Sequence, residues 1–258
     1  LPNSVTTISA NSLTADLTLT AGTSGTTIVS GTGADKFTLT GGTNNVTASN
    51  GNDVIRISGG ANTIDTGSNN DEVDVSNGTN NINTGGGNDE VTISGGTNTL
   101  NTDSGNDVVD VSGGINDIET GSGSDQVTLT GGNNDVDTGS NNDTVTLSSG
   151  TDNVNTGSGN DTIEAAATLT TADTINGGNG TDTIASTLAI TDALAARISN
   201  VEILDIKGGG GITHDVSDLT GLTSLKASAA LTGNVIITDL AASAEVDISV
   251  ALGNDLTI

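Results

Sequence analysis

Aspartate residues recur at a constant interval through the middle of the chain, 18 residues apart and eight times in succession. Four of them close the word Gly-Asn-Asp, as in Gly87-Asn88-Asp89 and Gly159-Asn160-Asp161. A constant period of this length is typical of a solenoid, in which every repeat forms one coil. The eight positions are Asp35, Asp53, Asp71, Asp89, Asp107, Asp125, Asp143 and Asp161.

Stacked coils would place these carboxylates in one column. Successive coils of a β-solenoid lie about 4.8 Å apart, which is the spacing of neighbouring strands. Like charges directly opposed in a sheet destabilise it, and the five Lys and Arg residues of the chain cannot neutralise the column. The column therefore indicates a bound cation, which a metal ion can supply.

The composition narrows the fold to a thin, elongated architecture. The 258 residues include 37 Gly, one Phe and no Trp, Tyr, Met or Cys. A globular domain of this length normally has aromatic side chains in its core, so we expect a narrow solenoid filled by Val, Ile, Leu and Ala. Without cysteine there are no disulfides, and a metal is the obvious alternative cross-link.

The formal net charge of −27, from 32 acidic and 5 basic residues, restricts the partners of the chain. Nucleic acid and anionic membrane surfaces require clustered Lys and Arg and are excluded, whereas cations are favoured. No apolar run is long enough to insert into a membrane. The chain begins at Leu1 without a signal peptide, so we expect any targeting signal to lie outside it.

Apolar residues at fixed offsets from each aspartate predict two short strands per coil. Positions two and four residues after the aspartate are apolar, as at Ile55 and Ile57, which is the alternation of a strand with one buried face. A third apolar column, which includes Ile64 and Ile82, predicts a second strand on the other side of the coil. Gly pairs between the two strands supply the positive φ angles of tight turns.

Two polar columns accompany the strands, and we interpret both as structural. Stacked Asn amides can bond from coil to coil, as in cross-β ladders. The Asn column is Asn44, Asn62, Asn80, Asn98, Asn116 and Asn134, with Asp152 last, and the Thr column is Thr66, Thr84, Thr102, Thr120, Thr138 and Thr156.

These patterns predict an all-β chain in three parts. Residues 1–30 are expected to form a capping coil, residues 31–184 a parallel β-roll or β-solenoid with 18-residue coils, and residues 185–258 an irregular β region that continues the stack. In the last part, 191–199 could form a short helix capped by Thr191. Strands are expected at 201–206, 224–227, 234–238, 244–250 and 255–258.

The word Gly177-Gly178-Asn179-Gly180-Thr181-Asp182-Thr183-Ile184 resembles the nonapeptide of the RTX, or haemolysin-type calcium-binding, repeat family at every defined position. The resemblance covers about 31–184. It implies that Ca²⁺ is shared between the Asp side chains and turn carbonyls of consecutive coils, and Ca²⁺ suits such hard oxygen ligands. It adds Asp173, Asp182, Gly157, Gly159, Gly178 and Gly180 to the expected metal-binding residues.

The chain departs from that family in one respect. A standard repeat has an Asp every nine residues, whereas the alternate half-coil here has none. We therefore expect calcium on one edge and the Asn ladder on the other. The alternative for the aspartates is an Asx-turn, in which each Asp caps its own backbone.

The segment Ser199 to Ile206 resembles segments of Gram-negative surface-layer proteins of the RTX type. The resemblance implies a secreted, cell-surface structural protein that self-associates into a lattice and could contact cell-surface polysaccharide. An adhesin or stalk segment, the export tail of a secreted protein and an ice-binding Thr/Asn face are the alternatives. No catalytic spacing of Ser, His and Asp, phosphate loop or Cys nucleophile occurs, so we expect no enzyme, and His214 is expected to be structural.

Overall fold

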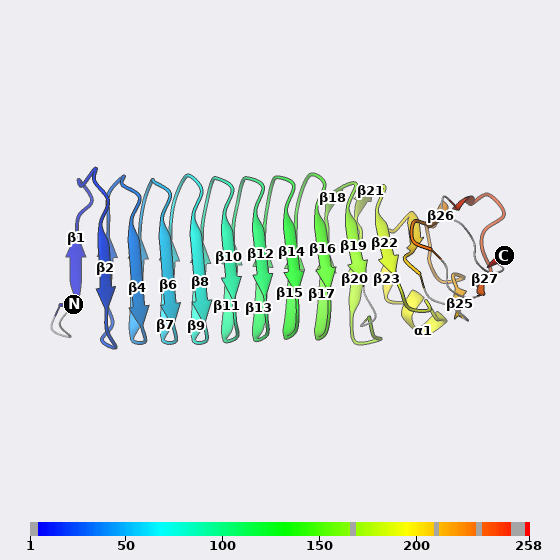
Figure 1. Cartoon of the computed structure of the whole chain (residues 1–258), viewed down its shortest axis with the longest axis horizontal. Coiled ribbons are helices and arrows are strands. Elements are labelled where there is room, and N and C mark those ends of the chain that lie inside the picture. The colour runs from blue at the N-terminus through cyan, green and yellow to red at the C-terminus, as the bar shows by residue number, and fades with distance from the viewer. Residues whose placement is uncertain (1–4, 166–168, 209–211, 231–233, 249–255) are drawn as a thin grey trace.

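The chain forms a long parallel β-solenoid, with its two termini at opposite ends of the rod (Figure 1). The structure is a computed structural model that describes residues 5–165, 169–208, 212–230, 234–248 and 256–258. Only one helix, α1 (Asp192–Ala195), is present among these residues. The predicted all-β solenoid with 18-residue coils is therefore confirmed.

Two parallel sheets form the opposite walls of the solenoid, and the chain alternates between them. The first, which we call the even sheet, has 13 strands: β2 (Thr18–Ala21), β4 (Lys36–Thr40), β6 (Val54–Ser58), β8 (Glu72–Ser76), β10 (Glu90–Ile93), β12 (Val108–Val111), β14 (Gln126–Leu129), β16 (Thr144–Leu147), β19 (Thr162–Ala165), β22 (Thr183–Ser186), β24 (Ile203–Ile206), β26 (Ser224–Ala227) and β28 (Glu245–Ile248).

The second, which we call the odd sheet, has 11 strands. They are β1 (Thr7–Ser9), β3 (Thr27–Val29), β5 (Thr43–Thr47), β7 (Ala61–Asp65), β9 (Thr79–Asn83), β11 (Thr97–Asn101), β13 (Ile115–Glu119), β15 (Asn133–Asp137), β17 (Thr151–Asn155), β20 (Thr174–Asn176) and β23 (Ile198–Ser199).

The register places equivalent residues of successive coils directly beside one another. Ile55 pairs with Val73 in the even sheet, and Ile64 pairs with Ile82 in the odd sheet. Every second side chain of a strand is buried, and the buried ones form one continuous core of Val, Ile, Leu and Ala with the single Phe37. Because side chains alternate between the two faces of a strand, a one-residue slip of any strand would expose its whole buried set.

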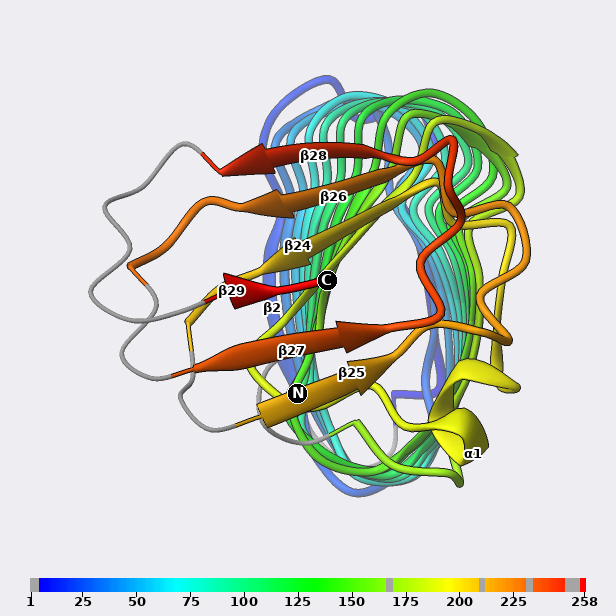
Figure 2. The ribbon, with the colours of Figure 1, turned by 90° about the vertical axis from the view of Figure 1, so that its right-hand side faces the viewer.

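The C-terminal region continues the stack in a less regular way. Strands β24, β26 and β28 extend the even sheet, while β25 (Ile212–Asp215), β27 (Val235–Thr238) and β29 (Leu256–Thr257) form a separate three-stranded sheet beside them (Figure 2). The predicted strand at 224–227 is present at the predicted residues as β26, whereas β25 was not predicted. The helix predicted at 191–199 is shorter, because Ile198–Ser199 form β23 in the odd sheet. Thr191 stands at the N-cap of α1, but its side chain makes no capping hydrogen bond.

Candidate metal column

The recurring aspartates are buried at one edge of the solenoid. Each one ends the turn that leads from an odd-sheet strand into the next even-sheet strand, so Asp71 directly precedes β8 and Asp89 directly precedes β10. None of these side chains is more than 3% exposed. We call this set the aspartate column: Asp35, Asp53, Asp71, Asp89, Asp107, Asp125, Asp143, Asp161 and Asp182.

The Oδ1 atoms of the column are tied to the main chain of the preceding coil. The backbone N–H of Asp71 donates to Oδ1 of Asp89 at 2.8 Å, and the same bond recurs from Leu17 to Asp182. Each carboxylate thus reaches back across one coil and does not cap its own turn. The Asx-turn alternative does not describe the column, because these bonds join residues in different coils.

The Oδ2 atoms of the column have no hydrogen-bond partner, although they are completely buried. Burial raises the pKa of Asp53 and Asp143 to about 7, and that of Asp71, Asp107 and Asp182 to about 6. Burial also raises the pKa of Asp89, Asp125 and Asp161. A buried carboxylate oxygen without a partner is costly, so the column requires a proton or a cation.

The Thr column lies in the same turns and has a structural role. The Thr66 hydroxyl donates to the carbonyl of Thr84 at 3.1 Å, and Thr102, Thr120 and Thr138 repeat this bond. The Thr66 hydroxyl also lowers the pKa of Asp71, against the larger effect of burial. These hydroxyls therefore join successive coils through hydrogen bonds to main-chain carbonyls.

Glycine makes the close approach of the turns possible. A Cβ atom on Gly105 would lie 1.4 Å from the carbonyl oxygen of Gly87, at a φ of 139° that L-residues rarely adopt. The glycines predicted as metal-binding, Gly157, Gly159, Gly178 and Gly180, are stacked in the same manner, and β18 (Ser158–Gly159) pairs with β21 (Asn179–Gly180). The carbonyl of Gly157 accepts the N–H of Asn179 at 2.7 Å.

The donor atoms of this edge suit a hard cation. No group of three or more His, Cys, Asp or Glu side chains in the described part of the chain is gathered closely enough to hold a metal ion. A cation here would therefore have to combine the Oδ2 atoms of the column with main-chain carbonyls. Carboxylate and carbonyl oxygens are the ligands that Ca²⁺ takes in flexible geometry, and the unpartnered Oδ2 atoms fit it.

The Asn column occupies the opposite edge, as predicted. Nδ2 of Asn80 donates to Oδ1 of Asn98 at 2.7 Å and to the carbonyl of Asn77 in its own turn at 3.1 Å. The last amide of the ladder, Asn134, donates to Oδ1 of Asp152 at 2.6 Å, and burial raises the pKa of Asp152. All six amides are buried.

Asp173 is separated by the structure from the other predicted metal-binding aspartates. Its Oδ1 accepts the N–H of Asp152, so it stacks at the end of the Asn column. Its Oδ2 accepts from the backbone and the hydroxyl of Thr170. Asp173 therefore has partners for both carboxylate oxygens within the protein, unlike Asp182.

Glu202 extends the aspartate column and was not predicted from the sequence. Its Oε2 accepts the N–H of Asp182 at 2.8 Å, in the manner of an aspartate of the column. The step from Asp161 to Asp182 is 21 residues and that from Asp182 to Glu202 is 20, so the 18-residue period does not reach it. Glu202 falls inside the strand predicted at 201–206, whereas the observed strand β24 begins at Ile203, so its place directly before a strand was not visible in the sequence.

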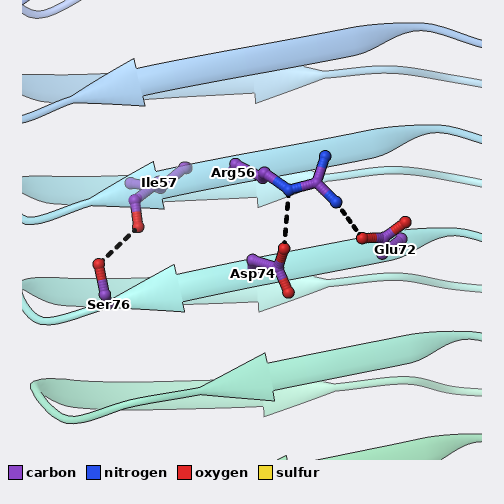
Figure 3. Close-up of polar contacts among 5 residues, drawn as sticks. All are labelled: Arg56, Ile57, Glu72, Asp74 and Ser76. Carbon is purple, nitrogen blue, oxygen red and sulfur yellow. Dashed lines mark hydrogen bonds and ion pairs between the residues drawn. The ribbon is translucent and has the colours of Figure 1, made fainter.

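Two other polar features lie outside the column: Arg56 has ion-pair partners within the protein, whereas the buried Nε2 of His214 has no hydrogen-bond partner. A shallow groove of about 240 Å³ on the even sheet contains Arg56, whose guanidinium bonds to Glu72 and, at 2.9 Å, to Asp74 (Figure 3). His214 is fully buried, its Nδ1 accepts the N–H of Ile190, and burial lowers its pKa to about 4. We assign no catalytic or metal-binding role to either feature. His214 is a neutral core residue of the C-terminal region.

The fold and the column define a β-solenoid with a row of buried carboxylates along one edge. Comparison with known families agrees: residues 20–55, 56–91, 92–127, 110–145, 128–163 and 169–187 match the model of the RTX calcium-binding nonapeptide repeat, which spans four copies. These matches cover more than half of the chain, which therefore belongs to the RTX calcium-binding repeat family. No curated protein and no solved structure matches it. None of the helices in the described part is long and apolar enough to cross a membrane.

Proposed function

We propose that this chain is the calcium-stiffened solenoid of a secreted surface-layer protein, which folds outside the cell and assembles into a surface lattice. The observation that carries the proposal is the row of buried Oδ2 atoms without hydrogen-bond partners. We assign residues 1–30 to a capping coil, 31–184 to the calcium-binding solenoid and 185–258 to a β region stacked on it.

Bound Ca²⁺ would supply positive charge and coordination to oxygens that the protein leaves unsatisfied. The residues that would hold it are the members of the aspartate column through Oδ2, with carbonyls of the adjoining turns, including those of Gly157, Gly159, Gly178 and Gly180. Asp173 is a weaker candidate, because both of its oxygens already accept hydrogen bonds. The Oδ1 atoms keep their bonds to the main chain and hold each carboxylate in place.

The charge of the aspartate column would make folding depend on the calcium concentration around the chain. In the absence of cations the carboxylates repel one another when the coils stack, so the chain is held in a looser state that suits export. Because binding free energy becomes folding free energy, calcium outside the cell would drive the chain to its stacked form. The formal charge of −27 gives this switch its strength.

The outward face of the odd sheet supports assembly. In the odd sheet, Asp117 is beside Asp135 and Glu119 is beside Asp137 in adjacent strands, with alternate side chains directed outward. Such rows of exposed carboxylates could be bridged by cations between neighbouring molecules. Cell-surface polysaccharide is a further partner that we propose for the anchored layer.

Negative-stain microscopy of the chain in Ca²⁺, in EGTA and in Mg²⁺ tests the proposal. Ordered sheets that form only in Ca²⁺ would support a surface layer. Single stiff rods in Ca²⁺ would contradict the lattice and favour an adhesin stalk or the export tail of a secreted protein. Identical rods in Ca²⁺ and in EGTA would contradict the calcium-dependent step itself.

A further inference from the structure

The aspartate column ends on a residue that differs from the rest of it. Glu202 follows Asp182 as the next carboxylate, and it belongs to the C-terminal region outside the regular repeats. The Oδ2 atom of Asp182 is buried without a partner, like the other members of the column, and its side chain is 0% exposed. The last interval of the column therefore lies between a repeat residue and a C-terminal residue.

The backbone at Glu202 explains why a longer side chain occupies this place. In a regular coil only the residue after the column position donates to the preceding aspartate carbonyl, as Glu90 does to Asp71. At the last interval the N–H groups of Glu202 and Ile203 both donate to the carbonyl of Asp182, at 3.2 and 2.9 Å. The main chain is thus turned here, and the extra methylene of Glu202 lets its carboxylate still reach the Asp182 N–H.

A third oxygen faces the same place. A Cβ atom built on Gly177 would lie 2.1 Å from the carbonyl oxygen of Asn200 and 2.9 Å from Oδ2 of Asp182. Because Gly177 has no side chain, these two oxygens can both approach the place that a Cβ atom would otherwise take. Asn200 has a φ of 52°, a left-handed conformation that is uncommon for a residue other than Gly.

We propose that Asp182, Glu202 and the carbonyl of Asn200 form a terminal divalent-cation site that joins the C-terminal region to the repeat solenoid. The proposal rests on the calcium-binding function proposed above and adds to it a site between the last repeat and the C-terminal region. Two carboxylates and a carbonyl form a hard oxygen set suited to Ca²⁺. Their attachment to two different parts of the chain makes occupancy of the site a clamp on residues 198–206.

The test compares two neutralising variants of the full chain, Glu202→Gln and Glu245→Gln. Gln at position 202 keeps an oxygen that can accept the Asp182 N–H, so the fold should be retained while the charge is lost. Glu245 is exposed, begins β28 in the same region and gives the same change of net charge. Bound Ca²⁺ per chain is counted by equilibrium dialysis, and amide protection of 198–206 is measured by hydrogen exchange with and without Ca²⁺.

We expect Glu202→Gln to bind one Ca²⁺ fewer than the wild-type chain and to lose the calcium-dependent protection of 198–206, while Glu245→Gln behaves as wild type. The proposal is overturned if Glu202→Gln binds the same number of ions with unchanged protection, and in that case the column in the repeats still stands. If the wild-type chain binds no Ca²⁺, the proposed function fails and the terminal site fails with it. Loss of ions from both variants alike would also overturn it, because the effect would then reflect net charge.

Discussion

The backbone N–H of Asp89 donates a 2.8 Å hydrogen bond to Oδ1 of Asp107, one coil further along the solenoid. This bond uses one carboxylate oxygen and leaves Oδ2 of Asp107 buried without a partner. The same carboxylate therefore holds two coils together and carries an unsatisfied charge. When the charge is removed, the free energy of unfolding without metal should therefore rise, and the additional stability given by Ca²⁺ should fall.

Asp107→Asn should separate these two effects. Asn keeps an Oδ1 acceptor for the Asp89 N–H but removes the buried charge, whose burial is costly. We expect the free energy of unfolding in EGTA to rise by about 1 kcal/mol or more, and the additional stability given by Ca²⁺ to fall. Urea unfolding with and without Ca²⁺ measures both. Asp110→Asn, an exposed change on β12, is the control and should alter neither.

The metal-free protein should be more stable in mild acid than at alkaline pH. Burial raises the pKa of Asp53 and Asp143 from 3.8 to about 7, so the folded state binds protons more tightly than the unfolded state. The resulting stability is fully present below pH 3.8 and is lost as pH rises through about 7. In EGTA we expect a higher melting temperature at pH 5 than at pH 8. The double variant Asp53→Asn, Asp143→Asn should show a smaller difference, and an opposite slope in the wild type would refute the interpretation.

The Asn ladder should contribute to stability independently of metal. Asn98→Ala removes the acceptor of Asn80 and the donor to Asn116, which leaves buried amide groups unpaired. We expect a loss of about 2–4 kcal/mol, because each unpaired buried group costs about 1–3 kcal/mol. Thr99→Ala, an exposed change on the same strand β11, should stay within about 0.5 kcal/mol. Equal effects of the two changes in chemical denaturation would show that the ladder is not a stabilising feature.

Two glycines test how closely the turns are packed. Gly105→Ala would place a Cβ against the Gly87 carbonyl, whereas a Cβ on Gly113 would meet nothing within 4 Å. Both have positive φ, 139° and 117°, so both variants bear backbone strain of about 1–2 kcal/mol. Only Gly105→Ala adds a collision, and we expect it to cost more than about 3 kcal/mol. Similar melting temperatures for the two variants would contradict this packing.

The 18-residue period was sufficient to predict the solenoid, its two walls, the edge that carries the aspartates and the Asn ladder on the other edge. It could do so because a repeated pattern has only one in-register stacking that buries all apolar columns. The period could not place Asp173, since the longer step of 21 residues from Asp152 moves it to the Asn column. It also could not reveal Glu202, because the coil that contains it departs from the repeat in length and path.

The hydrogen bonds of the carboxylates were likewise not predictable from the sequence. Charge repulsion indicated a need for cations, but the sequence does not show that Oδ1 accepts a main-chain N–H from the preceding coil. This bond depends on the direction of the N–H at the column position, which the turn geometry of each coil sets. It leaves one oxygen per carboxylate for a metal.

The central claim is that the buried Oδ2 atoms of the column hold a divalent cation. The most direct test measures thermal unfolding of the full chain by far-UV circular dichroism. The chain is first treated with EGTA, and Ca²⁺ is then added in steps, with Mg²⁺ as the control. Each site filled at about 100 times its Kd adds about 2.7 kcal/mol, so the account predicts a melting temperature that rises steeply with Ca²⁺ and little with Mg²⁺. An equal melting temperature in EGTA and in saturating Ca²⁺ would contradict it.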